Sequence, residues 1–292
     1  EDLTVLYQVS ATKRNLANKS GFTRWSDPLL TPEDLGVNGE SLKPRLAAFL
    51  EVNKTDGDSL VLPNKIQSER SLWQPKPKLE FFVDFETVNS LKDTFEEFPN
   101  QSGQDLIFMI GCGHMEEGDW QFKCFITDRL TETEEARIID EWFDYMNLVQ
   151  SRLDTGNNAH IYHWSAAEVN FLQKASNSAY NRHPDNNWPD PNWFDFLQRV
   201  MRQEPVVVRG AHGFGLKAIT KALNNLELID IEWPDGTTDG LGAMTGAWWC
   251  DEQAEINGDT LTDYELMDDI RDYNEIDCRA MLEIISYLRI KH

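Results

Sequence analysis

The sequence has few cysteines, no long apolar run and no leader-like beginning. Its 4 cysteines are far apart and form no CxxC pair, which indicates reduced thiols of a cytoplasmic protein and argues against a disulfide framework or a zinc site. No stretch approaches the roughly 20 apolar residues that a membrane-spanning helix needs. The first residues, EDLTVLYQVS, lack the basic and apolar segments of a secretory signal. They also lack an initiating Met, which suggests a piece of a larger protein, such as a nuclease or repair protein.

Basic residues are scarce, and several common motifs are missing. Lys and Arg number 27 against 50 Asp and Glu, for a net charge of −23. This charge repels nucleic acid at long range, because Lys and Arg carry phosphate binding. It also suits a metal site built from carboxylates beside a local basic track, so composition leaves the substrate open. No GxxxxGK[ST] phosphate loop and no GxSxG turn occurs, and the glycines of 210–215 lack dinucleotide-binding spacing.

Apolar and aromatic residues are plentiful enough for a substantial core. They make up 40% of the 292 residues and include 10 Trp and 15 Phe, which excludes a disordered chain. The Pro/Lys stretch at 74–78 interrupts both helix and strand, and predicts a small helical region at 1–74 followed by a second domain at 75–292. In the first region, short helical segments are expected at 3–6, 11–17 and 44–50.

The pattern after this boundary predicts a layered α/β domain. Apolar runs predict buried strands at 79–84 and 106–111, alternation predicts a half-exposed strand at 120–126, and a short strand is expected at 160–163. Helices are expected after a Thr131-x-x-Glu134 capping box, and at 166–179, 193–202, 216–223 and 263–289. Strands followed by helices in one domain predict a sheet with helices packed on its faces. The glycine-containing, acidic stretch 225–262 is interpreted as a lid or a surface loop.

Two acids alternate in the first predicted strand of this domain, Val83-Asp84-Phe85-Glu86-Thr87. Alternate side chains of a strand share a face, so Asp84 and Glu86 point the same way. Two neighbouring carboxylates repel each other unless a cation lies between them, and Mg²⁺ or Mn²⁺ suits oxygen ligands. For so short a pattern alone, a pair of solvated acids is the favoured alternative.

A further acid interrupts the apolar stripe of the last predicted helix. The stripe consists of Leu266, Ile270, Tyr273, Asp277, Met281, Ile284 and Leu288. Because an unpaired buried carboxylate is costly, Asp277 is expected to be neutral, paired or metal-bound. Tyr273 lies one turn earlier on the same face. Capping of a neighbouring helix, or pairing with Arg271 or Arg279, is the alternative for Asp277.

Together, D-x-E on a first strand and Y-x-x-x-D on a last helix resemble the first and third motifs of the tyrosine-containing DEDD 3′–5′ exonucleases. The segments 160–168, 193–197, 215–219 and 273–280 resemble, in this order, the RNase H-like domain of the RecB family nucleases. This resemblance covers most of residues 79–292. It implies an α/β fold of RNase H-like, DnaQ-like type, with a mixed sheet flanked by helices. The N-terminal RecB-like nuclease of those proteins has no counterpart in this sequence.

The resemblance also implies a function, a metal-dependent 3′–5′ exonuclease on single-stranded DNA. Two Mg²⁺ or Mn²⁺ ions about 4 Å apart are expected to act on the scissile phosphate. The implied ligands are Asp84, Glu86, Glu168 and Asp277, with Asp195 as an alternative. Glu168 stands where the family usually has Asp, and an ordinary first-turn acid is its other interpretation. Tyr273 is expected to orient or deprotonate the attacking water.

Substrate-binding roles are expected for Phe85, Thr87, His163 and Lys217. Phe85 and the pair Trp248-Trp249 are candidates for stacking on terminal bases, with core packing as the alternative. Lys217 is a candidate member of a basic track, for which solvated helix faces are the alternative; the other members are Lys221, Arg199, Arg202 and Arg209.

The expected partner is nucleic acid rather than a membrane, and the expected location is the cytoplasm. RNA is an alternative substrate, and an endonuclease acting on branched DNA is an alternative within the same fold. The rival of a different class is a catalytically inert RNase H-like module that binds nucleic acid or a protein. A proofreading domain of a polymerase is a further alternative, which only the shared motifs support.

Overall fold

The computed structural model describes residues 2–54, 59–89, 105–156, 158–176, 183–234 and 240–292. Its contacts divide the chain into two compact units. The first unit consists of Glu1–Lys76, Asp195–Glu232 and Leu282–His292, and the second of Pro77–Phe194 and Trp233–Met281. The division into domains at 1–74 and 75–292 stays a prediction. Among the described helices, none is long and apolar enough to cross a membrane.

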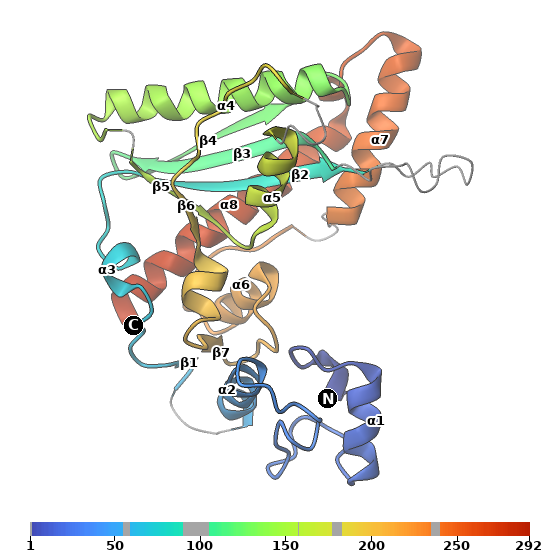
Figure 1. Cartoon of the computed structure of the whole chain (residues 1–292), viewed down its shortest axis with the longest axis vertical. Coiled ribbons are helices and arrows are strands. Elements are labelled where there is room, and N and C mark those ends of the chain that lie inside the picture. Colours follow the sequence, from blue (N-terminus) through green and yellow to red (C-terminus); the bar gives the residue numbers. More distant parts are fainter. Residues whose placement is uncertain (1, 55–58, 90–104, 157, 177–182, 235–239) are drawn as a thin grey trace. The chain divides into compact units, whose positions relative to one another are not determined.

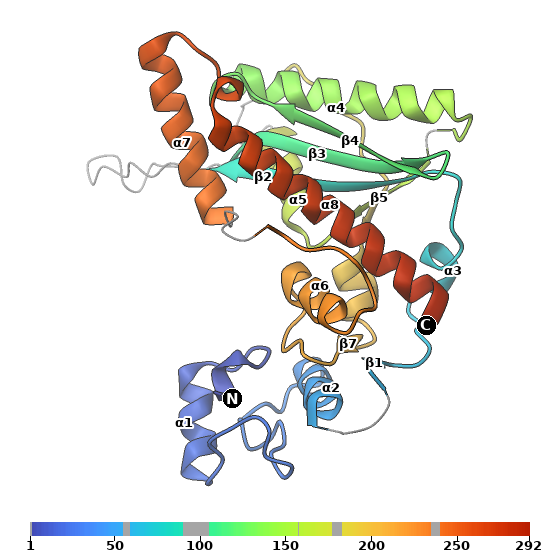
Figure 2. The ribbon, with the colours of Figure 1, turned by 180° about the vertical axis from the view of Figure 1, so that it is seen from behind.

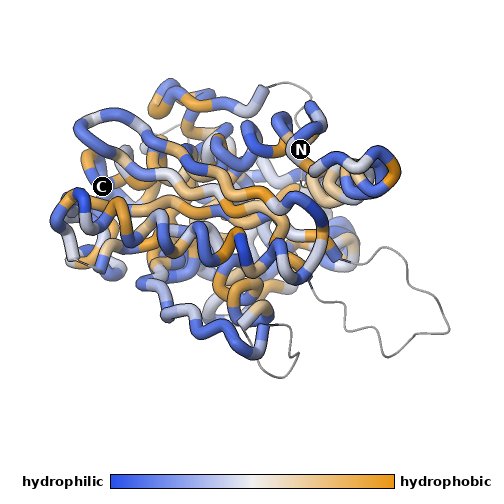
Figure 3. Tube along the Cα trace, turned by 90° about the horizontal axis from the view of Figure 1, so that it is seen from above, coloured by the Kyte–Doolittle hydropathy of each residue, from blue (hydrophilic) through white to orange (hydrophobic). Residues whose placement is uncertain are grey.

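The second unit is built on a five-stranded mixed sheet with the strand order β4-β3-β2-β5-β6 (Figure 1). The strands are β2 (Glu80–Val88), β3 (Leu106–Glu116), β4 (Asp119–Ile126), β5 (His160–His163) and β6 (Trp193–Asp195). Strand β2 pairs antiparallel with β3 and parallel with β5. Strands β2 and β3 are mostly buried, as expected where both faces of a sheet are covered, whereas β4 alternates between exposed and partly buried residues. The hydropathy trace in Figure 3 shows orange stretches within the molecule. The predicted α/β class with helices on the sheet is confirmed.

Alternation along β2 divides its side chains between the two faces of the sheet. Phe81, Val83 and Phe85 join a core formed with α4 (Glu132–Arg152) and α5 (Ala167–Ser176). Val88, at the end of the strand, joins a second core formed with α7 (Gly240–Asn257) and α8 (Glu265–Lys291). Figure 2 shows α8 running across the face opposite to the one covered by α4. This second face also receives Asp84 and Glu86.

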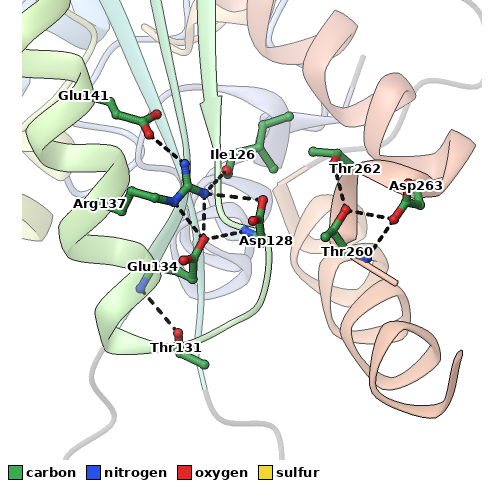
Figure 4. Close-up of polar contacts among 9 residues, drawn as sticks. All are labelled: Ile126, Asp128, Thr131, Glu134, Arg137, Glu141, Thr260, Thr262 and Asp263. Carbon is green, nitrogen blue, oxygen red and sulfur yellow. Dashed lines mark hydrogen bonds and ion pairs between the residues drawn. The ribbon is translucent and has the colours of Figure 1, made fainter. Parts of the chain in front are cut away.

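Helix α4 begins at a cap that matches the predicted capping box only in part. The Oγ1 atom of Thr131 accepts a hydrogen bond from the backbone N–H of Glu134, at 3.3 Å. The carboxylate of Glu134 instead accepts from the backbone of Asp128, at 2.8 Å, and from the guanidinium of Arg137, at 2.6 Å (Figure 4). The backbone N–H of Thr131, which a complete box would join to Glu134, donates to the carbonyl of Arg129 at 2.8 Å instead. A complete capping box joins Thr260 and Asp263 at η3 (Leu261–Asp263), also drawn in Figure 4.

The predicted helix at 193–202 is wrong in its first residues. Trp193–Asp195 is strand β6, and a π-helical turn η2 (Leu197–Met201) follows it. The ring of Trp193 stacks with that of Trp142, at 5.8 Å between centroids, and Phe194 is completely buried against Tyr162. Aromatic packing at the edge of the sheet therefore overrides the helical pattern of the sequence.

The predicted lid or loop at 225–262 is also wrong in part, because α7 occupies Gly240–Asn257. Its glycines suggest a loop, but Gly246 serves packing. A Cβ atom there would lie 3.1–3.3 Å from side-chain atoms of Leu266 and Ile270. The small residue thus lets α7 approach α8 closely.

The first unit combines helices with a two-stranded antiparallel sheet of β1 (Val61–Leu62) and β7 (Val207–Val208). The helical segments predicted near the N-terminus are confirmed as η1 (Leu3–Val5), α1 (Ala11–Lys19) and α2 (Leu42–Lys54). The remaining helices of this unit are α3 (Arg70–Trp73), η2, α6 (Leu216–Asn225) and the end of α8. The predicted helices at 166–179, 216–223 and 263–289 correspond to α5, α6 and α8, although residues 177–179 lie outside the described residues.

Candidate metal centre

Carboxylates from β2 and α8 meet on the sheet face that α8 covers. Asp84 and Glu86 alternate along β2 and share that face, and Asp277 lies on α8. Each of the three offers an oxygen atom within 4.8 Å of the oxygen atoms of the other two. Glu86 and Asp277 are buried, at 7% exposure each, and Asp84 is half-buried. The structure thus brings together acids that are 191 positions apart in their numbering, from Glu86 to Asp277.

This arrangement is electrostatically unfavourable without a cation. Loss of hydration raises the pKa of Asp84 well above its ordinary value, and the charges of Asp277, Glu86 and Glu168 raise it further. A divalent cation would relieve this repulsion. The donor set consists only of carboxylate oxygens, which hard cations such as Mg²⁺ and Mn²⁺ prefer. The residues present therefore fit the implied metal.

Tyr273 lies one turn before Asp277 and is 6% exposed. A hydrogen bond joins its hydroxyl to the carboxylate of Asp277. Burial raises the pKa of Tyr273 strongly, and the charges of Asp277, Glu86 and Asp84 add to this effect. In the metal-free site the hydroxyl therefore keeps its proton at neutral pH and acts as a hydrogen-bond donor.

Two residues that contact the carboxylates were not predicted from the sequence. The indole N–H of Trp233 donates to Oδ1 of Asp277 at 3.1 Å, and Nδ2 of Asn274 donates to Oδ2 of Asp84 at 2.8 Å. Arg271, the pairing partner considered for Asp277, instead contacts Asp268 and Asp272. Arg279, the other partner considered, is exposed. Asn274 follows Tyr273 directly, so a polar residue inside the buried helix was the available signal; Trp233 lies in no recognisable pattern.

Glu168 lies near the three carboxylates but is not a member of their group. It is 5% exposed in the first turn of α5, and its charge contributes to the raised pKa of Asp84. Its Oε2 atom lies 3.3 Å from Nδ1 of His163. His163 ends β5 and is 1% exposed. The structure therefore places Glu168 and His163 together beside the group of Asp84, Glu86 and Asp277.

A family model for the RNase H superfamily (RNase_H_2) matches residues 82–289, which is more than two thirds of the chain. The chain belongs to the RNase H superfamily. No curated protein and no solved structure matches it. Membership makes the five-stranded mixed sheet an RNase H-like fold and nucleic acid the implied substrate. The matched region contains the three clustered carboxylates and Glu168.

The remaining predicted residues of this RNase H superfamily protein lie outside the group of three carboxylates, some in the second unit and some in the first. Phe85 is 6% exposed and packs on the core face, 5.4 Å from Trp142 between ring centroids, which agrees with core packing, the alternative to stacking. Thr87 is half-buried beside an irregularity of the β2–β3 pairing. Asp195 and Lys217 belong to the first unit. There, the carboxylate of Asp195 accepts from the backbone of Gln198 at 2.9 Å, and Lys217 is exposed on α6.

The other proposed substrate contacts are distributed between the two units. Trp248 donates its indole N–H to the backbone of Asn89 at 3.1 Å, while Trp249 is 50% exposed and contacts the ring of Tyr264. All members of the candidate basic track lie in the first unit. Two of them have structural contacts there, since Arg199 pairs with Glu69 and Arg209 donates to the backbone of Val52.

Proposed function

We propose that this chain is a metal-dependent nuclease of the DEDD type that shortens single-stranded DNA from its 3′ end. One observation carries the proposal: Asp84, Glu86 and Asp277 offer oxygen atoms within 4.8 Å of one another on one face of an RNase H-like sheet. The position of Tyr273 beside Asp277 supports the tyrosine-containing subgroup. The 3′–5′ direction and the preference for DNA rest on the resemblance to the DEDD and RecB family nucleases.

The residues of the site divide into metal ligands and a tyrosine that would act on the attacking water. Asp84, Glu86 and Asp277 would hold one divalent ion, and Glu168 would contribute to a second, directly or through water. Bound divalent ions supply charge neutralisation for the phosphate and lower the pKa of water. Tyr273 would orient the attacking water or remove a proton from it, and the tyrosine would lose its own proton more easily beside a divalent cation.

The same residues account for nucleic-acid binding by a very acidic chain. With a net charge of −23 and three clustered carboxylates, the metal-free site repels phosphate. A bound divalent cation is the largest local charge in such a site and inverts the local potential. We therefore expect productive binding of nucleic acid at this site to require the metal.

A gel time course tests the proposal. Single-stranded DNA and RNA of one sequence, each with a 5′ label, would be incubated with Mg²⁺, Mn²⁺ or EDTA. The wild type would be compared with Asp84→Ala and with the control Asp269→Ala, which removes an exposed carboxylate of α8. We expect a metal-dependent ladder that shortens from the 3′ end, is absent in Asp84→Ala and persists in Asp269→Ala.

Other results would point to the alternatives. Faster shortening of RNA would change the substrate, and internal cuts in branched DNA would indicate an endonuclease. Intact substrates under every condition, with wild type and Asp84→Ala alike, would contradict the proposal and favour an inert module that binds nucleic acid or protein. We also propose that the chain acts in the cytoplasm, either alone or as part of a larger nuclease or repair protein.

A further inference from the structure

Asn274 is a completely buried polar residue of helix α8 that faces strand β2. It is 0% exposed, and its Nδ2 atom donates to two oxygen atoms of Asp84: the carboxylate Oδ2 at 2.8 Å and the backbone carbonyl at 3.2 Å. A backbone carbonyl only accepts hydrogen bonds, so the NH₂ group of the amide must face Asp84. The orientation of the amide is therefore determined by its partners.

The other end of the amide faces Gly111 on β3. Gly111 lies directly opposite Asp84 in the antiparallel β2–β3 pair, and a Cβ atom at this position would lie 1.7 Å from Oδ1 of Asn274. Only glycine leaves room for the amide there. The same Oδ1 atom accepts no hydrogen bond from any residue that the structure describes. A buried acceptor without a partner is destabilising, so packing and stability alone do not explain an asparagine at this position.

We propose that Asn274 is a positioning residue that holds the Asp84 carboxylate in its metal-binding orientation, with Gly111 providing the space for it. The inference rests on the proposed nuclease function. Glu86 and Asp277 repel the Asp84 carboxylate, and a free side chain would rotate away from them. By binding Oδ2, Asn274 opposes that rotation and leaves Oδ1 for a cation. Groups that orient a metal ligand in this way change metal affinity by about 10–100-fold.

Asn274→Leu separates positioning from packing. Leucine has a similar size but neither donor nor acceptor, so it removes the bond to Asp84 together with the unpartnered Oδ1. We expect a melting temperature at or above that of the wild type, and Mn²⁺ binding weakened by about 10–100-fold in titration calorimetry. The control Asn53→Leu removes a half-buried amide of the first unit that donates to backbone carbonyls. It should leave Mn²⁺ affinity unchanged.

Gly111→Ala is a second, independent variant, because its methyl group would displace the Asn274 amide from the opposite strand. It should weaken Mn²⁺ binding in the same direction while Asn274 itself is present. If the wild type binds Mn²⁺ and Asp84→Ala does not, but every folded variant at 274 and 111 binds it as tightly as the wild type, the positioning role is wrong and the proposed function stands. If the wild type fails to bind Mn²⁺, the proposed function fails and the positioning role with it.

Discussion

The indole N–H of Trp233 donates a hydrogen bond to Oδ1 of Asp277, with 3.1 Å between the two atoms. Trp233 is half-buried and belongs to the same unit as the carboxylates, although it precedes α7 in the chain. Tyr273 is hydrogen-bonded to the same carboxylate, so Asp277 accepts from two aromatic residues. One of these two donors, Trp233, belongs to no motif in the sequence.

Replacing Trp233 by Phe should weaken metal binding and reduce the quenching of tryptophan fluorescence that Mn²⁺ causes. The variant keeps an aromatic ring but loses the donor to Asp277, so we expect Mn²⁺ affinity to fall by about tenfold. Mn²⁺ quenches nearby indoles, and quenching of tryptophan fluorescence in the wild type should shrink markedly in the variant. Trp249→Phe, which changes a half-exposed tryptophan of α7, is the control. Equal quenching in Trp233→Phe and the wild type would place the Mn²⁺ elsewhere.

Glu168 and Asp277 should differ in their effects on the metal. Asp277 is a member of the close group of carboxylates, whereas Glu168 is not. We therefore expect Asp277→Asn to abolish the tightest Mn²⁺ site in a calorimetric titration. Glu168→Gln should keep that site and lower the rate of DNA shortening by about 10–100-fold. Loss of the tight site in Glu168→Gln would instead make Glu168 a ligand of the first ion.

Mutual repulsion of the carboxylates should make the metal-free site a source of instability. Asp84→Asn removes one charge from the group while keeping the shape of the side chain. In EDTA we therefore expect its melting temperature to exceed that of the wild type by about 2–4 °C for each kcal/mol of relieved repulsion. Saturating Mn²⁺ should reverse the order, because the ion stabilises only a protein that binds it. A wild type as stable as Asp84→Asn in EDTA would show that the repulsion is relieved without a cation.

The elements that position the carboxylates could be predicted because their patterns are local. Strand β2 has an apolar run at 81–83 and is mostly buried, and alternation alone puts Asp84 and Glu86 on one face. Asp277 stands out because it interrupts an apolar helical stripe. The meeting of these acids was suggested only by the resemblance, since nothing local relates a strand at 80–88 to a helix at 265–291.

The contacts around the acids could not be predicted, because they depend on space rather than on sequence pattern. Gly111 looks like any glycine of a strand until Asn274 is seen against it. Phe85 carries the residue type of a stacking side chain, but the same alternation that exposes its neighbours to α8 buries it in the opposite core. Glycines likewise concealed α7, whose small residues permit helix packing.

Stability should depend on pH through Glu134, far along the chain from the acidic residues of the site. The hydrogen bond from Arg137 lowers the pKa of Glu134 most, and the backbone N–H of Asp128 lowers it further. Since the folded pKa lies below the ordinary value of 4.5, the unfolded chain binds the proton more readily. The stabilisation by this carboxylate is thus complete well above pH 4.5 and disappears as the pH falls through the folded pKa.

The variant Glu134→Gln should therefore be less stable than the wild type at pH 7, by about 0.5–1 kcal/mol for a partly exposed ion pair. The difference in the free energy of unfolding should persist at pH 6 and shrink between about pH 5 and pH 3, as measured by urea unfolding at each pH. Glu132→Gln changes an exposed acid in the same first turn of α4 and serves as the control. A stability difference that stayed constant down to pH 3 would mean that Glu134 stabilises the helix through its neutral hydrogen bonds and not through its charge.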